Sequence, residues 1–486
     1  MLPSQRALFD IPRDVCFLNA AAWSPLPIAV QEAGRAAVGR KGQPWKLDGA
    51  FFQAQYERAR KAAAALIGAS PDDVALISSV GYGVATAGKV LPVKPGSRVV
   101  VLQNDHTSPV LEWMSRAEAG AFTVDAVAQP TDGDWTSAVL ETIERKEAAP
   151  LAVVSVSSVH WSDGGALDMP RIAVAVKKRG AALLVDATHD AGVRRIDVKT
   201  LDPDFLIFPT YKWVLGPYGR AFMYVARRWQ NGVPLEQTAA ARKQVSAEDT
   251  IYFRDTSYRE DARRYDMGER DHFISLEMAA IGMEMMAGWG NDAIVERLSM
   301  LTGRLADGLG NLGVRLLDPK LRAPHIVCAA FPEGMPADFP KRLAAENVYA
   351  APLDTLDKVV GRWDTDFAHF GGKHSAGKPK VHDSDLKLQS FNRFPAAPIR
   401  VTRICQEISQ TGNAYNNVID FICSDGDTRD GAVPPPRGAS GSATPTRKDH
   451  AGDSTPARPA STNRPPVATT TKSQRTQRPS ASTTAR

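Results

Sequence analysis

The sequence AALLVDATHDAG occupies residues 181–192, and DFLIFPTYKWVLGPYGRAFMYV occupies residues 204–225. Both contain short runs that are apolar on both faces, which is typical of strands buried within a parallel sheet. Helical patterns separate these runs from similar ones upstream, at residues 74–79, 98–102 and 151–157. One such helix is capped by Asp168 and ends at Gly180. The alternation predicts a wound α/β domain with a mainly parallel sheet covered by helices on both sides.

The pattern changes after about residue 270. Three helical patterns and one strand pattern predict a smaller α+β domain; the helices are expected at 273–288, 291–310 and 338–346, and the strand at 325–331. We expect a large domain over residues 17–260. The small domain is expected to combine residues 1–16 and 261–352, to which residues 399–423 are a candidate addition.

Two later segments differ from both domains. Residues 353–398 are polar and show no assignable pattern. Residues 424–486 consist largely of Pro, Ser, Thr, Gly and Arg, which predicts a disordered tail because such a chain buries too little apolar surface to offset its ordering entropy.

Composition narrows the classes of function. The formal charge of the 486-residue chain is +5, and the tail alone holds ten Lys/Arg against five Asp, so residues 1–423 are formally neutral. This distribution gives no basic footprint for nucleic acid. Four cysteines without paired spacing indicate a reducing compartment. No signal-like segment and no long apolar run are present, so we expect a cytoplasmic protein without a membrane span.

Two ionisable residues stand at the ends of neighbouring strand patterns. Lys212 follows an apolar strand by three residues, and Asp186 ends the preceding buried strand. Taken singly, each has an ordinary explanation as a solvated lysine or a turn-capping aspartate. Together they lie at the carboxyl ends of sheet strands, where open α/β sheets bind ligands. A buried carboxylate needs a cationic or hydrogen-bonding partner, and a protonated pyridine nitrogen is one such partner.

A phosphate site is also expected. The segment SSVGYGVATAGK (78–89) combines a strand end, a glycine turn and a helix that opens near Tyr82. Backbone N–H groups at a helix start bind phosphate, although the same pattern also serves as an ordinary strand-to-helix connection.

Six motifs in this order resemble the class V aminotransferase family of enzymes dependent on pyridoxal 5′-phosphate (PLP), the fold-type I group that includes cysteine desulfurases, kynureninases and isopenicillin N epimerase-like proteins. They are FLNAAAWSPLP, NDHTSPVLEW, SVHWSDGGALD, VDATHDAG, YKWVLGPYG and ARRYDMGE. The resemblance covers about residues 17–350. It implies a fold with a seven-stranded sheet, PLP as the cofactor, a small amino acid as the substrate, and a homodimer.

The resemblance also implies roles for particular residues. Lys212 would join the cofactor covalently, Asp186 would pair with its pyridine nitrogen, and His106 would stack on its ring. His160 and His189 match positions near the phenolic oxygen, and which of the two reaches it stays open. The remaining implied contacts are Val80, Gly81, Tyr82, Thr210 and Tyr211 for the cofactor and Asn19 and Arg400 for the substrate. No metal site is expected.

One implied contact crosses the dimer interface. Residues 267–272 match a segment that reaches the neighbouring subunit's phosphate, commonly with Thr where this chain has Glu269. Because a glutamate would repel a phosphate dianion, we expect Arg263, Arg264 or Arg270 to neutralise the charge.

Several reactions share these early steps. We expect transamination or epimerisation at the α-carbon. The alternatives are a lyase or hydrolase of the kynureninase or desulfurase type, and an inactive homologue with a binding role. Desulfuration needs a nucleophilic thiol, whereas Cys328 stands in an apolar run and Cys405 in a region without a clear pattern.

Overall fold

The computed structural model describes residues 1–245, 255–310, 312–332 and 334–352. Arg400, Cys405, the predicted unassigned segment 353–398 and the predicted tail therefore lie outside the described residues.

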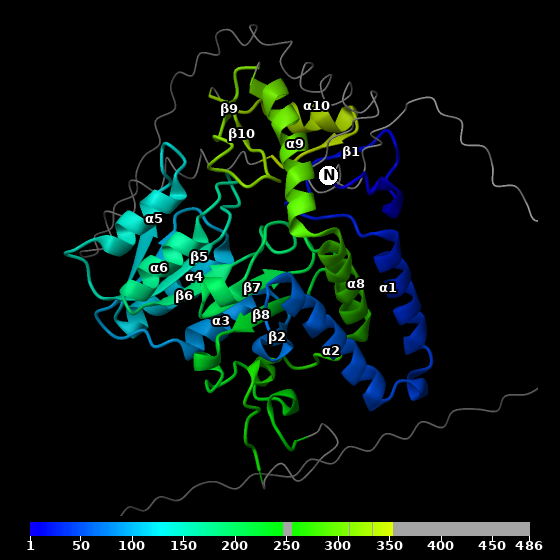
Figure 1. Cartoon of the computed structure of the whole chain (residues 1–486), viewed down its shortest axis with the longest axis vertical. Helices are drawn as coiled ribbons and strands as arrows, with labels where there is room; N and C mark the ends of the chain where they lie inside the picture. The colour runs from blue at the N-terminus through cyan, green and yellow to red at the C-terminus, as the bar shows by residue number, and fades with distance from the viewer. Residues whose placement is uncertain (246–254, 311, 333, 353–486) are drawn as a thin grey trace, which may run out of the picture. The chain divides into compact units, whose positions relative to one another are not determined.

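A seven-stranded sheet forms the centre, in the order β2-β8-β7-β6-β5-β3-β4 (Figure 1). Its strands are β2 (Val74–Ile77), β3 (Arg98–Leu102), β4 (Thr123–Val127), β5 (Leu151–Ser157), β6 (Ala182–Asp186), β7 (Phe205–Pro209) and β8 (Ala221–Val225). Only β8 runs against the others. The predicted mainly parallel sheet is thus confirmed. The sequence analysis missed β4, an edge strand whose residues are mostly not buried, so its apolar signal is weak.

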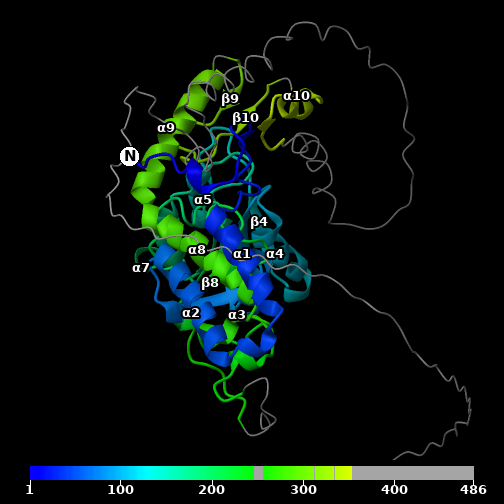
Figure 2. The same cartoon turned by 90° about the vertical axis from the view of Figure 1, so that its right-hand side faces the viewer.

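Helices cover both faces of the sheet, which gives the layered arrangement seen in Figure 2. The helices of the described residues are α1 (Ile28–Lys41), α2 (Gly49–Leu66), α3 (Val80–Val90), α4 (Thr107–Gly120), α5 (Trp135–Glu144), α6 (Met169–Lys178), α7 (Val198–Leu201), α8 (Phe273–Trp289), α9 (Asn291–Gly310) and α10 (Phe339–Ala345), and α10 packs beside β11 away from the sheet. Side chains of α2, α5, α6 and α8 join the buried cluster on one face. Those of α3 and α4 join the cluster on the other.

Side-chain alternation along the strands explains why both faces need a cover. In β7, Leu206 and Phe208 belong to the first cluster, whereas Phe205 and Ile207 belong to the second. Successive strand residues point to opposite faces, so a strand that is apolar at every position must be covered on both faces of the sheet. The expected helix over 169–178 has its cap where predicted, since Asp168 Oδ1 accepts the Arg171 N–H at 3.1 Å.

One expectation for the later region is wrong. Residues 325–331 do not form a strand throughout; only Ala329–Ala330 (β10) pair, with β9 (Arg315–Leu316). His325 and Ile326 are instead buried among loops that follow the sheet strands. Burial against those loops explains why these residues are apolar although they do not form the hydrogen-bonded ladder of a β-strand. The expected helices near 273–288, 291–310 and 338–346 correspond to α8, α9 and α10.

The two ends of the described region meet in a short parallel pair. Residues Cys16–Phe17 (β1) pair with Val348–Tyr349 (β11). Helix α8 packs against α1 and α2, and the three helices lie side by side in both views (Figures 1 and 2). The expected boundaries between a large and a small domain stay a prediction. No helix of the described residues is long and apolar enough to cross a membrane.

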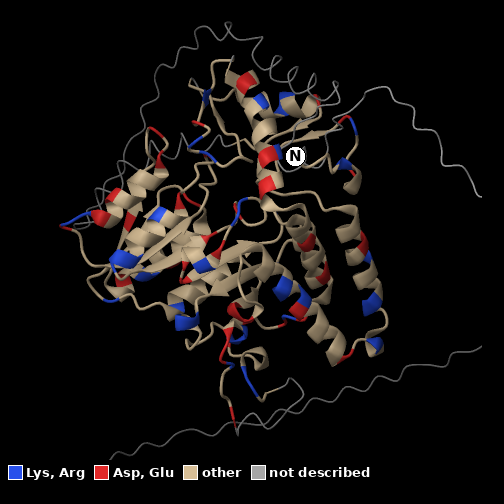
Figure 3. Cartoon of the chain, in the orientation of Figure 1, with Lys and Arg blue, Asp and Glu red and all other residues tan. Residues whose placement is uncertain are grey.

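Charged residues of both signs are interspersed over the helices and loops (Figure 3). Strands β5, β6 and β7 carry no charged residue except Asp186 at the end of β6. A few ionisable groups are nevertheless buried near the carboxyl ends of β6 and β7, among them Asp186, His189 and Lys212.

Candidate active site

Five loops meet at one edge of the sheet. Because six strands run in the same direction, the segments that follow β2, β3, β5, β6 and β7 leave from the same edge. They carry Ser79, His106, His160, His189 and Lys212, while Asp186 ends β6 itself. The structure thus brings together residues that the sequence spreads over more than 130 positions.

Lys212 is a buried lysine with no salt bridge in the part of the chain that the structure describes, and it is 7% exposed. Its Nζ lies 3.1 Å from His189 Nε2 and 5.7 Å from the centre of the Tyr211 ring. Burial lowers the pKa of Lys212 to about 8, although the charge of Asp186 acts in the opposite direction. About a tenth of the amine is then neutral at pH 7, far more than for an ordinary lysine.

Asp186 is a buried carboxylate. It is 2% exposed, accepts the Thr188 N–H at 2.9 Å and also accepts the Thr188 hydroxyl. Within the described ranges it forms no salt bridge. Burial raises its pKa, while the hydrogen bonds from Thr188 and the charges of His106 and Lys212 oppose the rise. The carboxylate is thus held in place without a neutralising cation close by.

His106 caps the start of α4, with Nδ1 3.5 Å from the Ser108 N–H nitrogen. Desolvation lowers its pKa, and the charge of Lys212 acts in the same direction against that of Asp186. His106 is therefore close enough to sense both groups. Its side chain remains exposed at the surface of the site.

His160 and His189 have different surroundings. His160 stacks on Trp135 at 4.3 Å between ring centres, and its Nε2 donates to the Gln103 carbonyl at 3.1 Å. Burial opposes its charge, but Asp163 and Asp105 outweigh burial and raise the pKa of His160. His189 is the histidine that contacts Lys212. Its pKa lies well below the usual value because it is buried beside Lys212.

Asp105 is a functional candidate that the sequence analysis did not single out. It accepts the Ser157 hydroxyl at 2.7 Å and the Ser157 N–H at 3.1 Å. Burial raises its pKa to about 6, with the charge of Asp186 adding to the rise and that of His160 opposing it. The motif NDHTSP contained Asp105, but no spacing signal indicated that its side chain turns toward β5.

The start of α3 provides free backbone N–H groups. Ser79 Oγ accepts the Tyr82 N–H at 3.1 Å, which leaves those of Val80 and Gly81 without an intrahelical acceptor. A side chain on Gly83 would approach Ile207 and Ile77 to within 2.8 and 2.9 Å, so this glycine lets the helix lie close to the sheet. This arrangement suits an anion at the helix start.

Thr210, which the resemblance implies as a cofactor contact, and Glu236 both form hydrogen bonds within the chain. The Thr210 hydroxyl, fully buried, donates to the carbonyls of Pro217 and Arg220 at 2.5 and 3.1 Å and so holds the turn after Lys212. Glu236, absent from the sequence analysis, accepts the Gly268 N–H. Burial and the charge of Glu236 raise the pKa of Tyr82.

The segment after β1 runs beside the lysine loop. The Ser24 N–H donates to the Tyr211 carbonyl at 3.2 Å, and Trp23 stacks on Tyr218 at 4.9 Å between ring centres. Tyr211 lies 4.5 Å from Tyr218 in the same cluster. The buried Asn19 Oδ1 has no hydrogen-bond partner in the described part of the chain. An unpaired buried oxygen at this place is available to a ligand.

The three arginines considered for the interface are all engaged within the chain. Arg263 binds Glu57, Asp72 and Asp261. Arg264 donates to two backbone carbonyls, and Arg270 binds Asp266 at 2.6 Å. Whether one of them also acts across a dimer stays a prediction.

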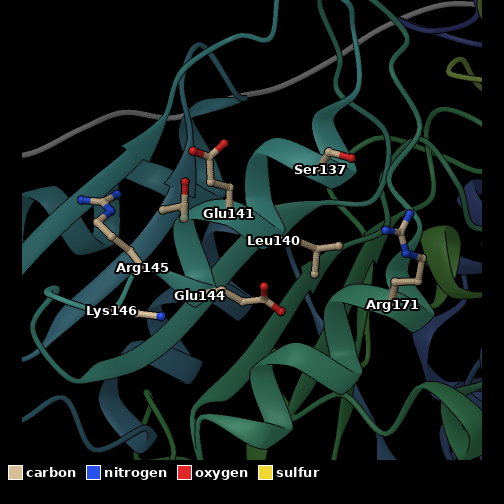
Figure 4. Close-up of a pocket in the computed structure, with 8 residues that line it drawn as sticks. Ser137, Leu140, Glu141, Glu144, Arg145, Lys146 and Arg171 are labelled. Carbon is tan, nitrogen blue, oxygen red and sulfur yellow. The ribbon is translucent and has the colours of Figure 1, made fainter.

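A separate surface hollow of about 770 Å³ lies on α5 and α6 (Figure 4). Its lining residues are Ser137, Leu140, Glu141, Thr142, Glu144, Arg145, Lys146 and Arg171. None of them belongs to the group around Lys212. The described residues also contain no cluster of His, Cys, Asp and Glu arranged to hold a metal ion.

The groups at the sheet edge fit PLP. A lysine amine suits its carbonyl carbon, a buried carboxylate lacking a nearby cation suits a protonated pyridine nitrogen, and a capped helix start suits its phosphate. The model of the family described as Aminotransferase class-V matches residues 17–351. The chain belongs to this family. Pyridoxal phosphate is accordingly its cofactor.

Known proteins of this class V family support the assignment. An "uncharacterized aminotransferase YcbU" of Bacillus subtilis is 28% identical over 276 residues, which cover 57% of this chain and 70% of that protein. The apo structure of a cysteine desulfurase from Thermococcus onnurineus NA1 has a TM-score of 0.60 at 22% identity, covering 71% of this chain and 86% of the other. A variant of C-DES with glycine covalently linked to its PLP cofactor also has a TM-score of 0.60, at 18% identity, covering 71% and 90%. The two structures carry the fold, which confirms the fold-type I expectation.

Proposed function

We propose that this class V enzyme transforms a small amino acid at its α-carbon, by transamination or epimerisation. The observation that carries the proposal is the buried Asp186 carboxylate, without a salt bridge in the described residues, near the buried amine of Lys212. When bound, PLP supplies an electron sink for the bonds at the α-carbon. The sink works best with a protonated ring nitrogen, and Asp186 is the group proposed to hold that proton.

Lys212 is proposed to serve twice. With its pKa lowered to about 8, its Nζ is a nucleophile for covalent attachment of the cofactor. Once an incoming substrate amine displaces it, the same Nζ can take the proton from the α-carbon and return it. Epimerisation would require a second acid on the opposite face of the α-carbon, whereas transamination would require the proton to go to the bound cofactor and water to release the keto acid.

The other residues are proposed as binding groups. His106 offers a ring face to the cofactor, and the N–H groups of Val80 and Gly81 offer donors to its phosphate. Between the two histidines left open by the sequence, we favour His189 as the donor to the phenolic oxygen. It lies 3.1 Å from Lys212 Nζ, whereas His160 is committed to Gln103 and Trp135. Asn19 is proposed as a substrate contact because its Oδ1 is buried and unpaired in the described residues.

Desulfuration is less well supported. It needs a thiolate that can reach the substrate, and burial raises the pKa of Cys328 to about 12. The other described cysteine, Cys16, is buried in β1. Neither position favours a reactive thiol.

The first experiment tests the attachment. Wild-type protein loaded with PLP is reduced with borohydride and digested, and the labelled peptide is identified by mass spectrometry. We expect the label on Lys212, no label in Lys212→Ala, and normal labelling in Lys199→Ala, whose lysine is exposed on α7. A label on another lysine of the wild-type protein would make the assignment of Lys212 wrong, and a protein that takes up no PLP would favour an inactive homologue with a binding role.

A second experiment separates the reactions. The loaded enzyme is incubated in deuterated water with single amino acids, and the products are analysed by chiral chromatography and mass spectrometry. Transamination gives a keto acid and consumes a keto-acid acceptor, whereas epimerisation gives the mirror-image amino acid with deuterium at the α-carbon. Release of alanine together with a β-substituent, in the absence of both outcomes, would contradict the proposal and favour the lyase or hydrolase alternatives.

We also propose a two-fold dimer in which residues 267–272 approach the partner's phosphate. Glu269 is exposed in this segment, and Arg270 lies next to it. Sedimentation of the loaded protein tests the assembly, and a fully active monomer would contradict it. Alanine substitution of Arg263, Arg264 and Arg270 in turn tests whether an arginine neutralises the charge of Glu269 beside the phosphate. Unchanged PLP affinity in all three variants would contradict that role.

A further inference from the structure

Trp213 follows the lysine directly and is buried at 1% exposure. Its indole Nε1 donates to His189 Nδ1 at 3.0 Å. On the opposite side of the imidazole, His189 Nε2 lies 3.1 Å from Lys212 Nζ. The two ring nitrogens of His189 thus face two neighbouring residues of one loop.

The chemistry of these atoms fixes the tautomer of His189. An indole N–H can only donate, so the Nδ1 atom that receives it must carry a lone pair and no proton. A neutral imidazole has a single N–H, which must then be on Nε2. An imidazolium would direct a second N–H at the indole N–H. Burial and the neighbouring Lys212 also disfavour that form, because they hold the pKa of His189 well below its usual value.

A second histidine, His325, contacts both His189 and Trp213. His325 Nε2 lies 2.7 Å from the His189 carbonyl, which can only accept, so His325 donates there. Its ring meets Trp213 edge to face at 4.4 Å between centres. Trp213 therefore lies between two histidines, one from the loop after β6 and one from the segment before β10.

We infer that Trp213 is a positioning residue that holds neutral His189 with its proton on Nε2, so that this N–H points at Lys212 Nζ. In this state Lys212 Nζ is the acceptor and keeps its lone pair as a neutral amine. His189 has no free lone pair at Lys212 and cannot act as a base there. The tautomer itself does not depend on the proposed function. Only the use of this N–H rests on it, as a donor to Lys212 or to the phenolic oxygen of the cofactor.

Other charged groups face the same atoms. Asp186 and His106 influence Lys212, and His325, His106 and His160 influence His189. None of these groups forms a hydrogen bond to a ring nitrogen of His189 in the described residues. The indole N–H of Trp213 does form such a bond, to Nδ1, and therefore selects the tautomer of His189.

The direct test needs no variant. The cofactor-free, full-length protein is labelled with ¹⁵N-histidine, and long-range proton–nitrogen spectra are recorded between pH 8.5 and pH 10, where Lys212 is a neutral amine. The chain has nine histidines, and the signals of His189 are identified by their loss in His189→Gln. We expect a single pattern with Nε2 protonated and Nδ1 bare throughout this range. A pattern with Nδ1 protonated, or titration to the imidazolium within the range, overturns the inference.

A variant tests the part played by the indole. Trp213→Phe keeps a ring beside His325 but removes the N–H, so the signals of His189 should become an average of both tautomers. A bare Nε2 could then accept a hydrogen bond from the ammonium form of Lys212 and stabilise that form. We expect the midpoint of Lys212 acetylation against pH to rise by up to about one unit, a tenfold change in the amine fraction.

The matched control is Trp229→Phe, which removes an indole N–H bound to Asp204 at 2.5 Å on another part of the sheet. Both variants lose an indole hydrogen bond, but only Trp213→Phe should move the His189 signals and the Lys212 midpoint. Unchanged values in a folded Trp213→Phe protein contradict the inference. If that variant does not fold, the wild-type spectrum still decides. Failure of borohydride labelling at Lys212 would remove the proposed function and leave this tautomer result intact.

Discussion

Two fully buried aspartates of this protein behave in opposite ways. Asp266 binds Arg60 through two hydrogen bonds of 2.7 and 3.0 Å, and it also binds Arg270 and the Leu76 N–H. Burial opposes its charge, but Arg60 and the other partners outweigh burial and lower its pKa. The carboxylate of Asp186 has only Thr188 as a hydrogen-bond partner in the described residues, and burial raises its pKa.

The difference distinguishes a structural carboxylate from one that waits for a ligand. Asp266 joins α2, β2 and the segment before α8, and all its charge is matched within the fold. The Asp186 carboxylate has no salt bridge in the described residues, and we propose that a bound cationic group compensates its desolvation. The same residue type thus serves stability in one place and is proposed to serve binding in the other.

The largest expected effect separates the two residues by activity. Asp186→Asn should lower α-carbon turnover by about two to four orders of magnitude, the range for losing a positioned proton, because an uncharged ring is a poor electron sink. Borohydride labelling at Lys212 should persist. Turnover is measured at saturating PLP. Near-normal turnover of Asp186→Asn would mean that its carboxylate does not serve the pyridine nitrogen.

The next effect separates them by stability. Asp266→Asn should lower the free energy of unfolding by about 3–5 kcal/mol, because it leaves Arg60 buried without its counter-charge. Asp186→Asn should cost nothing or stabilise, since it removes a buried charge while an amide oxygen can still accept from Thr188. Urea unfolding of the cofactor-free proteins measures both. Equal losses in the two variants would show that the contrast is not one of charge matching.

The third prediction concerns a substitution that should displace the loop after Lys212 without changing any charge. A side chain on Gly282 of α8 would lie 2.4 Å from the Val214 carbonyl, in the loop after Lys212. Gly282→Ala should therefore cost about 1–3 kcal/mol and reduce labelling of Lys212. Gly288→Ala on the same helix meets no atom within 4 Å and should raise stability by roughly 0.5–1 kcal/mol. Equal behaviour of the two variants would argue against a clamped loop.

The smallest expected effect is a pair of opposite pH dependences. Asp105 shares the environment of Asp186, and its folded pKa of about 6 lies above the ordinary value. Such a group stabilises the fold fully below the unfolded pKa of about 4 and loses this contribution as the pH rises through 6. Asp266 has a lowered pKa, so its contribution is present above about 4 and is lost on acidification.

Unfolding free energies measured from pH 3 to pH 7 test these signs. In the cofactor-free protein, Asp105→Asn should flatten the decline between about pH 4 and pH 6, and Asp266→Asn should flatten the decline toward acid. A steeper decline with rising pH in Asp105→Asn would contradict the raised pKa.

How far the sequence could lead depends on the range of each interaction. The strands β2, β3, β5, β6, β7 and β8 were predicted because runs apolar on both faces are a local property. The place of Lys212 and Asp186 at one edge followed from the direction of parallel strands. The edge strand β4 escaped because few of its residues are buried, and the run containing His325 was taken for a strand although it is buried against loops.

The contacts that finish the site were beyond the sequence. His189 meets His325 across 136 positions, and Arg60 meets Asp266 across 206. Nothing local in the chain indicates that one aspartate will find two arginines and the other none. The sequence by itself determined the layers, the strand ends and the residue types brought to the edge, because periodicity and turn chemistry act over a few residues. Only the tertiary structure decided which buried charges are matched and which nitrogen of His189 faces Lys212, because packing sets the partners of each side chain.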